Sequence, residues 1–262
     1  MNKISLKNRK GQTIIGVLEE PEGKLKGTCV VQHGWGGHKD KPTVQAIKNA
    51  FLESGFQTFN FDTTNSFGES DGEYEKSTLG LHWEDLEDVA KWTQQQEWFR
   101  GPLALAGHSK GGYAVARYAE EYPNEVGYLV PVAPVVSGKH SFEVHEKRDP
   151  EALKKWRESG VVESLGTDGN LKRKHWFQME ERLNHDLLPN ADKLVMPTLL
   201  IVGSEDESCP PYTVEILFDA IPDGSKAMKV IEGAPHSYNE KEEQNACKDA
   251  IIQWLRNETS LH

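Results

Sequence analysis

Short apolar segments alternate with amphipathic ones along most of this 262-residue chain, and that alternation constrains the fold more than any single motif. Residues 27–34, 102–107 and 197–203 are apolar runs bounded by glycine or proline, which indicates buried strands. Residues 42–56 and 82–99 carry apolar side chains at helical spacing. Apolar strands that alternate with helices are typical of a parallel sheet covered on both faces. The sequence therefore predicts the α/β class, with a mostly parallel sheet of about eight strands.

The same patterns extend this prediction to both ends of the chain. Residues 3–7 and 13–21 flank a turn-rich spacer and predict an opening β-hairpin. Further strands are expected at 57–62, 127–134 and 227–233, and further helices at 110–123 and 239–257.

One densely charged segment, residues 137–193, interrupts the alternation between two core strands. Its position predicts a small cap over the carboxyl edge of the sheet, and a surface excursion without a role in binding is the alternative. We therefore expect one α/β core, residues 1–136 and 194–262, with one inserted cap, residues 137–193.

Two elements are expected inside that segment. Residues 149–160 predict a short helix, with Pro150 in its first turn and a glycine after its end. Residues 161–177 predict a β-hairpin around the turn residues Asp168 and Gly169.

Composition and charge exclude several classes of protein. The formal net charge is −11, with acidic residues spread along the chain, which disfavours nucleic acid and anionic membranes as partners. No apolar run is long enough to span a membrane, and the first residues lack the apolar stretch of a secretory signal. The three cysteines are widely spaced and do not show the short spacings typical of metal ligands. The prediction is a cytoplasmic protein with no cofactor and no metal. Its oligomeric state is not readable, and a homodimer is one option.

Gly107-His-Ser-Lys-Gly111 follows a predicted strand and opens a predicted helix. Small residues two before and two after Ser109 allow a tight turn that displays its hydroxyl, and the helix N-terminus behind it favours developing negative charge. Alone, the motif could be no more than a strand-to-helix turn. In this context it predicts that Ser109 is a nucleophile.

A serine nucleophile needs a histidine base. His236 lies just after the last predicted core strand, at the same sheet edge as Ser109, and is the candidate. His108 adjoins Ser109 but is expected to point the wrong way. His33 and His38 lie in the first loop. Five more are expected to be solvated, namely His140, His145, His175, His185 and His262.

The base in turn needs a carboxylate to orient it. Asp206 follows the strand at 197–203, and its neighbour Glu205 is the alternative. Asp62 precedes Ser109 in the chain and is expected to stabilise a turn. The resulting order, Ser109, Asp206, His236, is the order in which α/β hydrolases carry these groups.

An oxyanion requires two backbone N–H donors. Lys110, directly after the nucleophile, supplies one, and we expect its backbone N–H to matter more than its amine. The glycine-rich loop at 33–37 supplies the second, at Trp35, whose ring is also expected to line the acyl pocket. Trp176 and Phe177, in the charged segment, are further candidates for substrate binding.

Together these motifs resemble the α/β-hydrolase superfamily, and within it the intracellular cinnamoyl or feruloyl esterases and the prolyl-oligopeptidase-like hydrolases. The resemblance runs from about Thr28 to Leu255 and implies the triad and oxyanion donors named above. Phe67 stands where relatives often carry histidine, and Lys110 where many carry methionine or glutamine. Both departures bear on the substrate rather than on the chemistry.

The function expected is hydrolysis of a small or medium carboxylic ester, a small-molecule substrate, through an acyl-enzyme. Peptidase or amidase, thioesterase and acyltransferase activities use the same groups and stay open. A binding protein that keeps the pocket without turnover is the remaining alternative.

Overall fold

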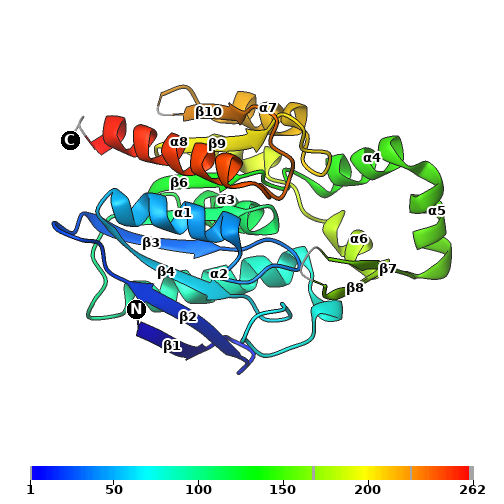
Figure 1. Ribbon diagram of the computed structural model, residues 1–262, viewed down its shortest axis with the longest axis horizontal. Helices are drawn as coiled ribbons and strands as arrows, with labels where there is room; N and C mark the ends of the chain where they lie inside the picture. The colour runs from blue at the N-terminus through cyan, green and yellow to red at the C-terminus, as the bar shows by residue number, and fades with distance from the viewer. Residues whose placement is uncertain (1, 167–168, 225, 260–262) are drawn as a thin grey trace.

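The core of the protein is one eight-stranded sheet, and a separate two-stranded hairpin lies outside it (Figure 1). The computed structural model describes residues 2–166, 169–224 and 226–259. The strands of the sheet are β1 (Asn2–Lys7), β2 (Thr13–Glu19), β3 (Gly27–Gln32), β4 (Phe56–Asp62), β5 (Leu103–His108), β6 (Val126–Val132), β9 (Thr198–Gly203) and β10 (Lys226–Ile231). Their order is β1-β2-β4-β3-β5-β6-β9-β10. The β1–β2 and β2–β4 pairs are antiparallel, and all pairs from β4 to β10 are parallel.

Helices cover both faces of this sheet (Figure 1). One face carries α1 (Pro42–Glu53) and α8 (Lys241–Thr259), and the other carries α2 (Leu79–Gln94) and α3 (Lys110–Glu121). The remaining core elements are α7 (Pro211–Ala220) and the 3-10 turn η1 (Tyr74–Lys76). The predicted α/β class with a mostly parallel sheet is confirmed.

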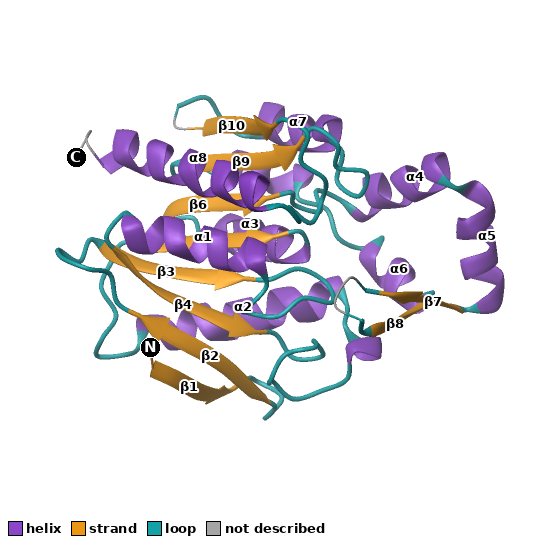
Figure 2. Ribbon diagram, in the orientation of Figure 1, coloured by secondary structure: helices purple, strands orange, loops and turns teal. Residues whose placement is uncertain are grey.

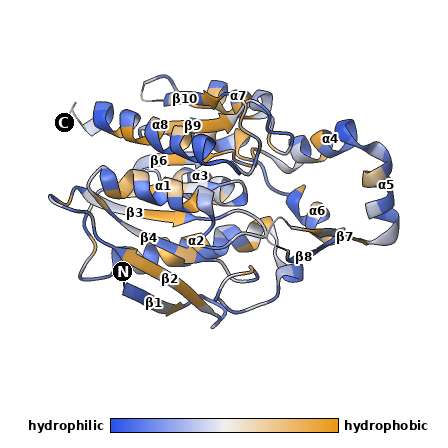
Figure 3. Cartoon of the chain, in the orientation of Figure 1, coloured by the Kyte–Doolittle hydropathy of each residue, from blue (hydrophilic) through white to orange (hydrophobic). Residues whose placement is uncertain are grey.

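The apolar strands are explained by burial on two sides. Successive residues of a strand point to opposite faces. Val30 of β3 belongs to the apolar cluster under α2 and α3, whereas its neighbour Val31 belongs to the cluster under α1 and α8. Figure 3 accordingly shows apolar strands running between helices with polar outer faces. Such burial stabilises the folded state by about 25 cal/mol for each Å² of apolar surface removed from water.

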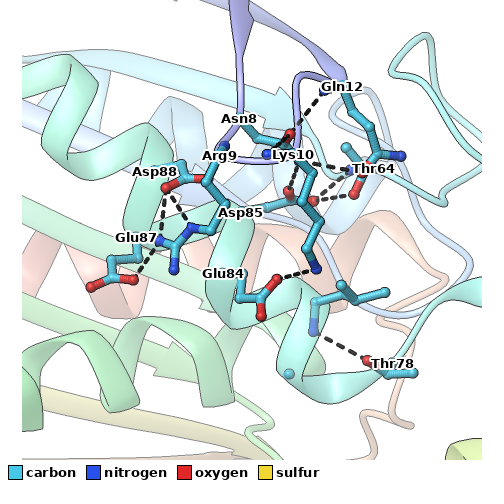
Figure 4. Close-up of polar contacts among 12 residues, drawn as sticks. Asn8, Arg9, Lys10, Gln12, Thr64, Thr78, Glu84, Asp85, Glu87 and Asp88 are labelled. Atoms are coloured by element: carbon cyan, nitrogen blue, oxygen red, sulfur yellow. Dashed lines mark hydrogen bonds and ion pairs between the residues drawn. The ribbon is translucent and has the colours of Figure 1, made fainter.

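Polar contacts fix the opening hairpin to α2 (Figure 4). In the turn between β1 and β2, Asn8 donates to the buried Asp85 at 3.0 Å, and Asp85 also accepts from the backbone N–H of Thr64 at 2.6 Å. Arg9 beside it pairs with Asp88 at 2.7 Å. The edge of the sheet is therefore tied to the helix behind it. α2 itself begins at Leu79 rather than the predicted residue 82, because the Thr78 hydroxyl caps it by accepting from Leu81.

The charged segment between β6 and β9, residues 137–193, is called the insert below. In Figure 2 it projects beyond the sheet as helices around a hairpin. It consists of α4 (Gly138–Arg148), α5 (Pro150–Ser159), β7 (Val161–Leu165), β8 (Leu171–His175), α6 (Phe177–Arg182) and the 3-10 turn η2 (Leu188–Lys193).

The insert has a small apolar cluster of its own, made by Leu153, Trp156 and Met179. Helix α5 and the pairing of β7 with β8 lie where the sequence predicts them, although Asp168 at the predicted hairpin turn lies outside the described residues. Helix α4 was not predicted, because only the Ser137 hydroxyl cap, which accepts from His140, signals its start. None of the described helices combines the length and the apolar character needed to cross a membrane.

Candidate active site

Ser109 lies in the tight turn between β5 and α3. Its backbone has φ 57° and ψ −116°, a conformation that costs a non-glycine residue about 1–3 kcal/mol and is held only by its surroundings. The Ser109 N–H donates to the carbonyl of Val132 on β6 at 2.9 Å, which anchors the turn to the neighbouring strand. Gly111 makes the turn possible, since a Cβ there would lie 2.5 Å from the carbonyl oxygen of Gln32. The hydroxyl is consequently presented at the carboxyl edge of the sheet.

A continuous chain of hydrogen bonds joins three of the predicted residues. The Ser109 hydroxyl lies 3.0 Å from His236 Nε2, and His236 Nδ1 lies 2.7 Å from Asp206 Oδ2. Asp206 is buried, and its other oxygen accepts the backbone N–H groups of Ser208 and Cys209, each at 2.8 Å. With Nδ1–H donating to the carboxylate, Nε2 is free to accept the proton of the serine.

The two carboxylates weighed against Asp206 lie elsewhere. The side chain of Glu205 is exposed, next to Asp206 but on the solvent side of the loop. Asp62 is fully buried at the end of β4, where it accepts from the backbone N–H of Lys39 at 2.6 Å and of Glu69 at 2.9 Å. It therefore stabilises the turn after β4.

The glycine-rich loop after β3 lies directly against Ser109. A Cβ on Gly34 would come within 2.8 Å of the Ser109 Cβ, so only glycine permits this approach. In the described part of the chain, neither the Trp35 N–H nor the Lys110 N–H has a hydrogen-bond acceptor. Two unpaired amides beside Ser109 suit a developing oxyanion.

Two histidines, the buried His33 and the half-buried His108, brace these loops. Burial lowers the pKa of His33, whose Nδ1–H donates to the Gly34 carbonyl at 2.7 Å while its Nε2 accepts from Thr63 at 3.0 Å. Burial, together with the neighbouring His236, lowers the pKa of His108 to about 3. His108 Nε2–H donates to the backbone carbonyl of His236 at 2.8 Å. The sequence predicts that His108 points the wrong way, yet it holds the loop that carries His236.

A cleft of about 630 Å³ opens beside Ser109. Its walls are the loop after β3, the start of α1, the loop that carries His236, and one residue of the insert. The lining residues are His33, Gly34, Trp35, Gly36, Gly37, Lys41, Pro42, Thr43, Val44, His108, Ser109, Lys172, His236, Ser237, Tyr238, Asn239 and Gln244.

The insert contributes to this cleft through a residue that was not predicted. Trp35 lines the cleft as expected, but Trp176 and Phe177 do not. Trp176 packs on the apolar cluster of the insert, and Phe177 is exposed, stacked on His175. Lys172 of β8 lines the cleft instead. Aromatic character suggested the wrong residues because Trp176 packs inside the insert rather than against the substrate cleft.

The insert histidines are not solvated as expected. His140, His145, His175 and His185 are half-buried, and His262 lies outside the described residues. His185 bridges the Tyr113 hydroxyl, 2.9 Å from Nδ1, and the Glu181 carboxylate, 2.6 Å from Nε2. In the described part of the chain, no three His, Cys, Asp or Glu side chains are arranged to hold a metal ion.

Comparisons with known proteins agree with this architecture. The chain is similar to an uncharacterized 31.7 kDa protein of Escherichia coli, 26% identical over 79% of this chain and 82% of the relative. It is also similar to a monoacylglycerol lipase of Mycolicibacterium smegmatis, 21% identical over 94% of this chain and 93% of that protein. Among solved structures, Est1E from Butyrivibrio proteoclasticus, with ferulic acid bound, superposes with a TM-score of 0.81 at 20% identity, covering 98% of this chain and 99% of Est1E.

The family comparison covers more than half of the chain. A model described as serine aminopeptidase, S33, matches residues 23–184, from the strand before the glycine-rich loop to the end of α6. The predicted resemblance to α/β-hydrolase serine hydrolases is confirmed by this match together with the fold. The chain belongs to the α/β-hydrolase family described as serine aminopeptidase, S33.

Proposed function

We propose that the protein is a serine esterase that hydrolyses small or medium carboxylic esters through an acyl-enzyme on Ser109. The observation that carries this proposal is the chain of hydrogen bonds from Asp206 through His236 to Ser109, at 2.7 and 3.0 Å. The monoacylglycerol lipase and the ferulic acid-bound Est1E named above support an ester as the substrate class.

In the acylation step, His236 Nε2 takes the hydroxyl proton of Ser109 as Oγ forms a bond to the ester carbonyl carbon. The N–H groups of Trp35 and Lys110 stabilise the oxyanion of the tetrahedral intermediate. When the intermediate collapses, the carbon–oxygen bond to the alcohol breaks, and the alcohol leaves with the proton held by His236.

Deacylation repeats these steps with water. His236 takes a proton from the water, the resulting hydroxide adds to the acyl carbon, and Ser109 leaves with its proton restored. The sum is one ester and one water converted to one acid and one alcohol. Asp206 stays ionised throughout and stabilises the imidazolium that forms twice in each cycle.

An ester fits the cleft better than a peptide with a free amino terminus. An aminopeptidase needs an anionic group to bind the ammonium of its substrate. None of the described residues that line the cleft is Asp or Glu, and the charged ones, Lys41 and Lys172, are cations. We further propose that the insert acts as a cap, since Lys172 of its hairpin borders the cleft that holds Ser109.

The test is hydrolysis of p-nitrophenyl acetate by the wild type and by Ser109→Ala. We expect the variant to lose activity by about 10⁴- to 10⁶-fold, because no other group replaces the nucleophile. An alanine variant that hydrolyses the ester at a comparable rate would refute the assignment. If the wild type turned over neither esters nor amides while retaining its fold, a binding protein would be the better description.

A further inference from the structure

Three cationic side chains surround the indole ring of Trp35 next to the proposed oxyanion site. Lys110 Nζ lies 4.1 Å from the ring centroid, Lys174 Nζ lies 5.3 Å from it, and the Arg182 guanidinium carbon lies 5.4 Å from it. We call Lys110, Lys174 and Arg182 the cation cluster. They come from α3, β8 and α6, so the core and the insert both contribute.

The cation cluster has no counter-charge of its own. None of the ion pairs among the described residues involves any of its three members. Glu181, next to Arg182 in the sequence, attracts Lys110 and Arg182 electrostatically but forms no ion pair with either. Its oxygens accept from the backbone N–H groups at the start of α2, at 3.0 and 2.8 Å, and pair with His185. Two of these cations, Lys110 and Arg182, are buried, where an unpaired charge is costly.

Several buried donors in the cluster also have no acceptor. Lys110 is 1% exposed and Arg182 6% exposed. Lys110 Nζ, Arg182 Nε and Trp35 Nε1 have no hydrogen-bond partner among the described residues. More than nine in ten buried polar groups in proteins are paired, and leaving one unpaired costs about 1–3 kcal/mol. Burial, reinforced by Arg182 and Lys174, holds the pKa of the Lys110 amine well below its usual range, so this amine gains from any anion placed beside it.

The cluster borders the catalytic cleft through Trp35, although its three cations do not themselves line the cleft. Trp35 lines the cleft, and its indole ring also contacts the three cationic side chains. Residues two apart on a strand share a face, so Lys174 lies on the same face of β8 as Lys172, which lines the cleft. The alcohol of the substrate must lie beside His236, which protonates it. The acyl group then points away from His236, toward the wall of the cleft that Trp35 forms.

Resting on the proposed esterase activity, we propose that the cation cluster binds a carboxylate on the acyl part of the substrate. The substrate class is accordingly the half-ester of a dicarboxylic acid. The Arg182 guanidinium and the Lys110 amine offer charge-assisted hydrogen bonds to its two oxygens, and the Trp35 Nε1–H is a third donor. This assigns a role to the amine of Lys110, which the sequence led us to expect would matter less than the backbone N–H.

The test compares ethyl hydrogen succinate, glutarate and adipate with ethyl butyrate, valerate and hexanoate, following acid release by chromatography. At the best chain length we expect the wild type to favour the half-ester in kcat/KM by about ten-fold or more. Arg182→Met should lower this ratio by about ten-fold, and Lys174→Met, which alters a half-buried side chain with little risk to folding, by about three-fold.

The matched control is Arg173→Met. Arg173 neighbours Lys174 on β8, but it is exposed on the opposite face and pairs with Glu163 at 2.6 Å, so its loss should leave the ratio unchanged. The proposal is overturned if the wild type prefers the neutral ester at every length, or if Arg182→Met and Lys174→Met leave the ratio unchanged.

A binding measurement separates this proposal from the proposed activity. If neither ester series is hydrolysed, the esterase proposal fails, and calorimetry of ethyl hydrogen glutarate with the Ser109→Ala protein decides the anion site independently. We expect binding that weakens by about three-fold in the Ser109→Ala, Lys174→Met double variant. Absence of binding to Ser109→Ala would overturn the inference.

Discussion

The polar side chains on the two sides of Ser109 differ in whether they have hydrogen-bond partners. Toward His236, each side-chain nitrogen or oxygen of the base and of Asp206 has a partner, and the His236 carbonyl is held by His108. Toward the insert, Lys110 Nζ and Arg182 Nε are buried with no acceptor among the described residues, although Arg182 Nη1 donates to the Ser141 hydroxyl at 2.8 Å. A satisfied network fixes geometry, whereas unsatisfied donors favour whatever can accept from them. We therefore propose that the first side cleaves the bond and that the second selects the acyl group.

The satisfied side predicts the largest effect. Asp206→Asn should lower kcat for p-nitrophenyl acetate by about 10²- to 10⁴-fold, because the amide cannot hold the imidazole in the same tautomer or stabilise its charge. Glu205→Gln is the matched control, one residue away and exposed, and should retain activity. The reverse pattern, with Glu205→Gln inactive, would transfer the role to Glu205.

The brace behind the base predicts a smaller effect. His108→Leu should lower kcat by about ten-fold with KM little changed, since the loop bearing His236 loses the donor that positions its carbonyl. His108→Gln offers an amide donor and should recover part of the loss. Equal falls in kcat for both variants would argue that His108 acts through packing rather than through this hydrogen bond.

Helix α3 shows what an unsatisfied buried charge costs when no substrate is available to pair with it. At its far end, burial raises the pKa of Glu120 to about 8 despite the ion pair with Arg117 at 3.2 Å, and Glu120 Oε1 has no partner among the described residues. The folded state therefore holds this proton more tightly than the unfolded chain does. The contribution of Glu120 to the free energy of unfolding falls as the pH rises from the usual pKa of 4.5 toward 8. Below and above that range this contribution does not change with pH.

Glu120→Gln removes this titration. At pH 8 we expect the variant to unfold at a higher temperature than the wild type, with a free energy of unfolding about 1–2 kcal/mol larger. At pH 4 we expect the two proteins to be equally stable. Thermal unfolding followed by circular dichroism at both pH values measures the difference. A variant that is less stable than the wild type at pH 8 would mean that the ionised carboxylate is favourably paired.

The smallest effect is expected at Phe177, which belongs neither to the hydrogen-bonded side of Ser109 nor to the cation cluster. Because its exposed ring does not line the cleft, Phe177→Ala should change kcat/KM for any ester by less than about two-fold. A loss of ten-fold or more in steady-state assays would show that this ring reaches the substrate after all.

Local patterns were enough to predict the core. Apolar runs such as that of β9, and the glycines around Ser109, report on burial and turn geometry, which neighbouring residues largely determine. The positions of Asp206 and His236 could be predicted because parallel strands end at one edge of the sheet.

The insert was harder to predict because long-range packing decides which of its side chains meet the core. Trp176 turns toward Trp156 inside the insert, at 5.4 Å between ring centroids, while Lys174 approaches Trp35 across the domain. No spacing in the sequence connects Lys110, Lys174 and Arg182. Their convergence depends on how β8 and α6 dock onto the core.

The most direct test of the central claim is covalent labelling of Ser109. We expect a fluorophosphonate probe to modify the wild-type protein once, and peptide mass spectrometry to place the label on Ser109, since the hydroxyl paired with His236 is the activated nucleophile. Labelling should be lost in Ser109→Ala. Modification of a different residue, or equal labelling of the alanine variant, would contradict the account.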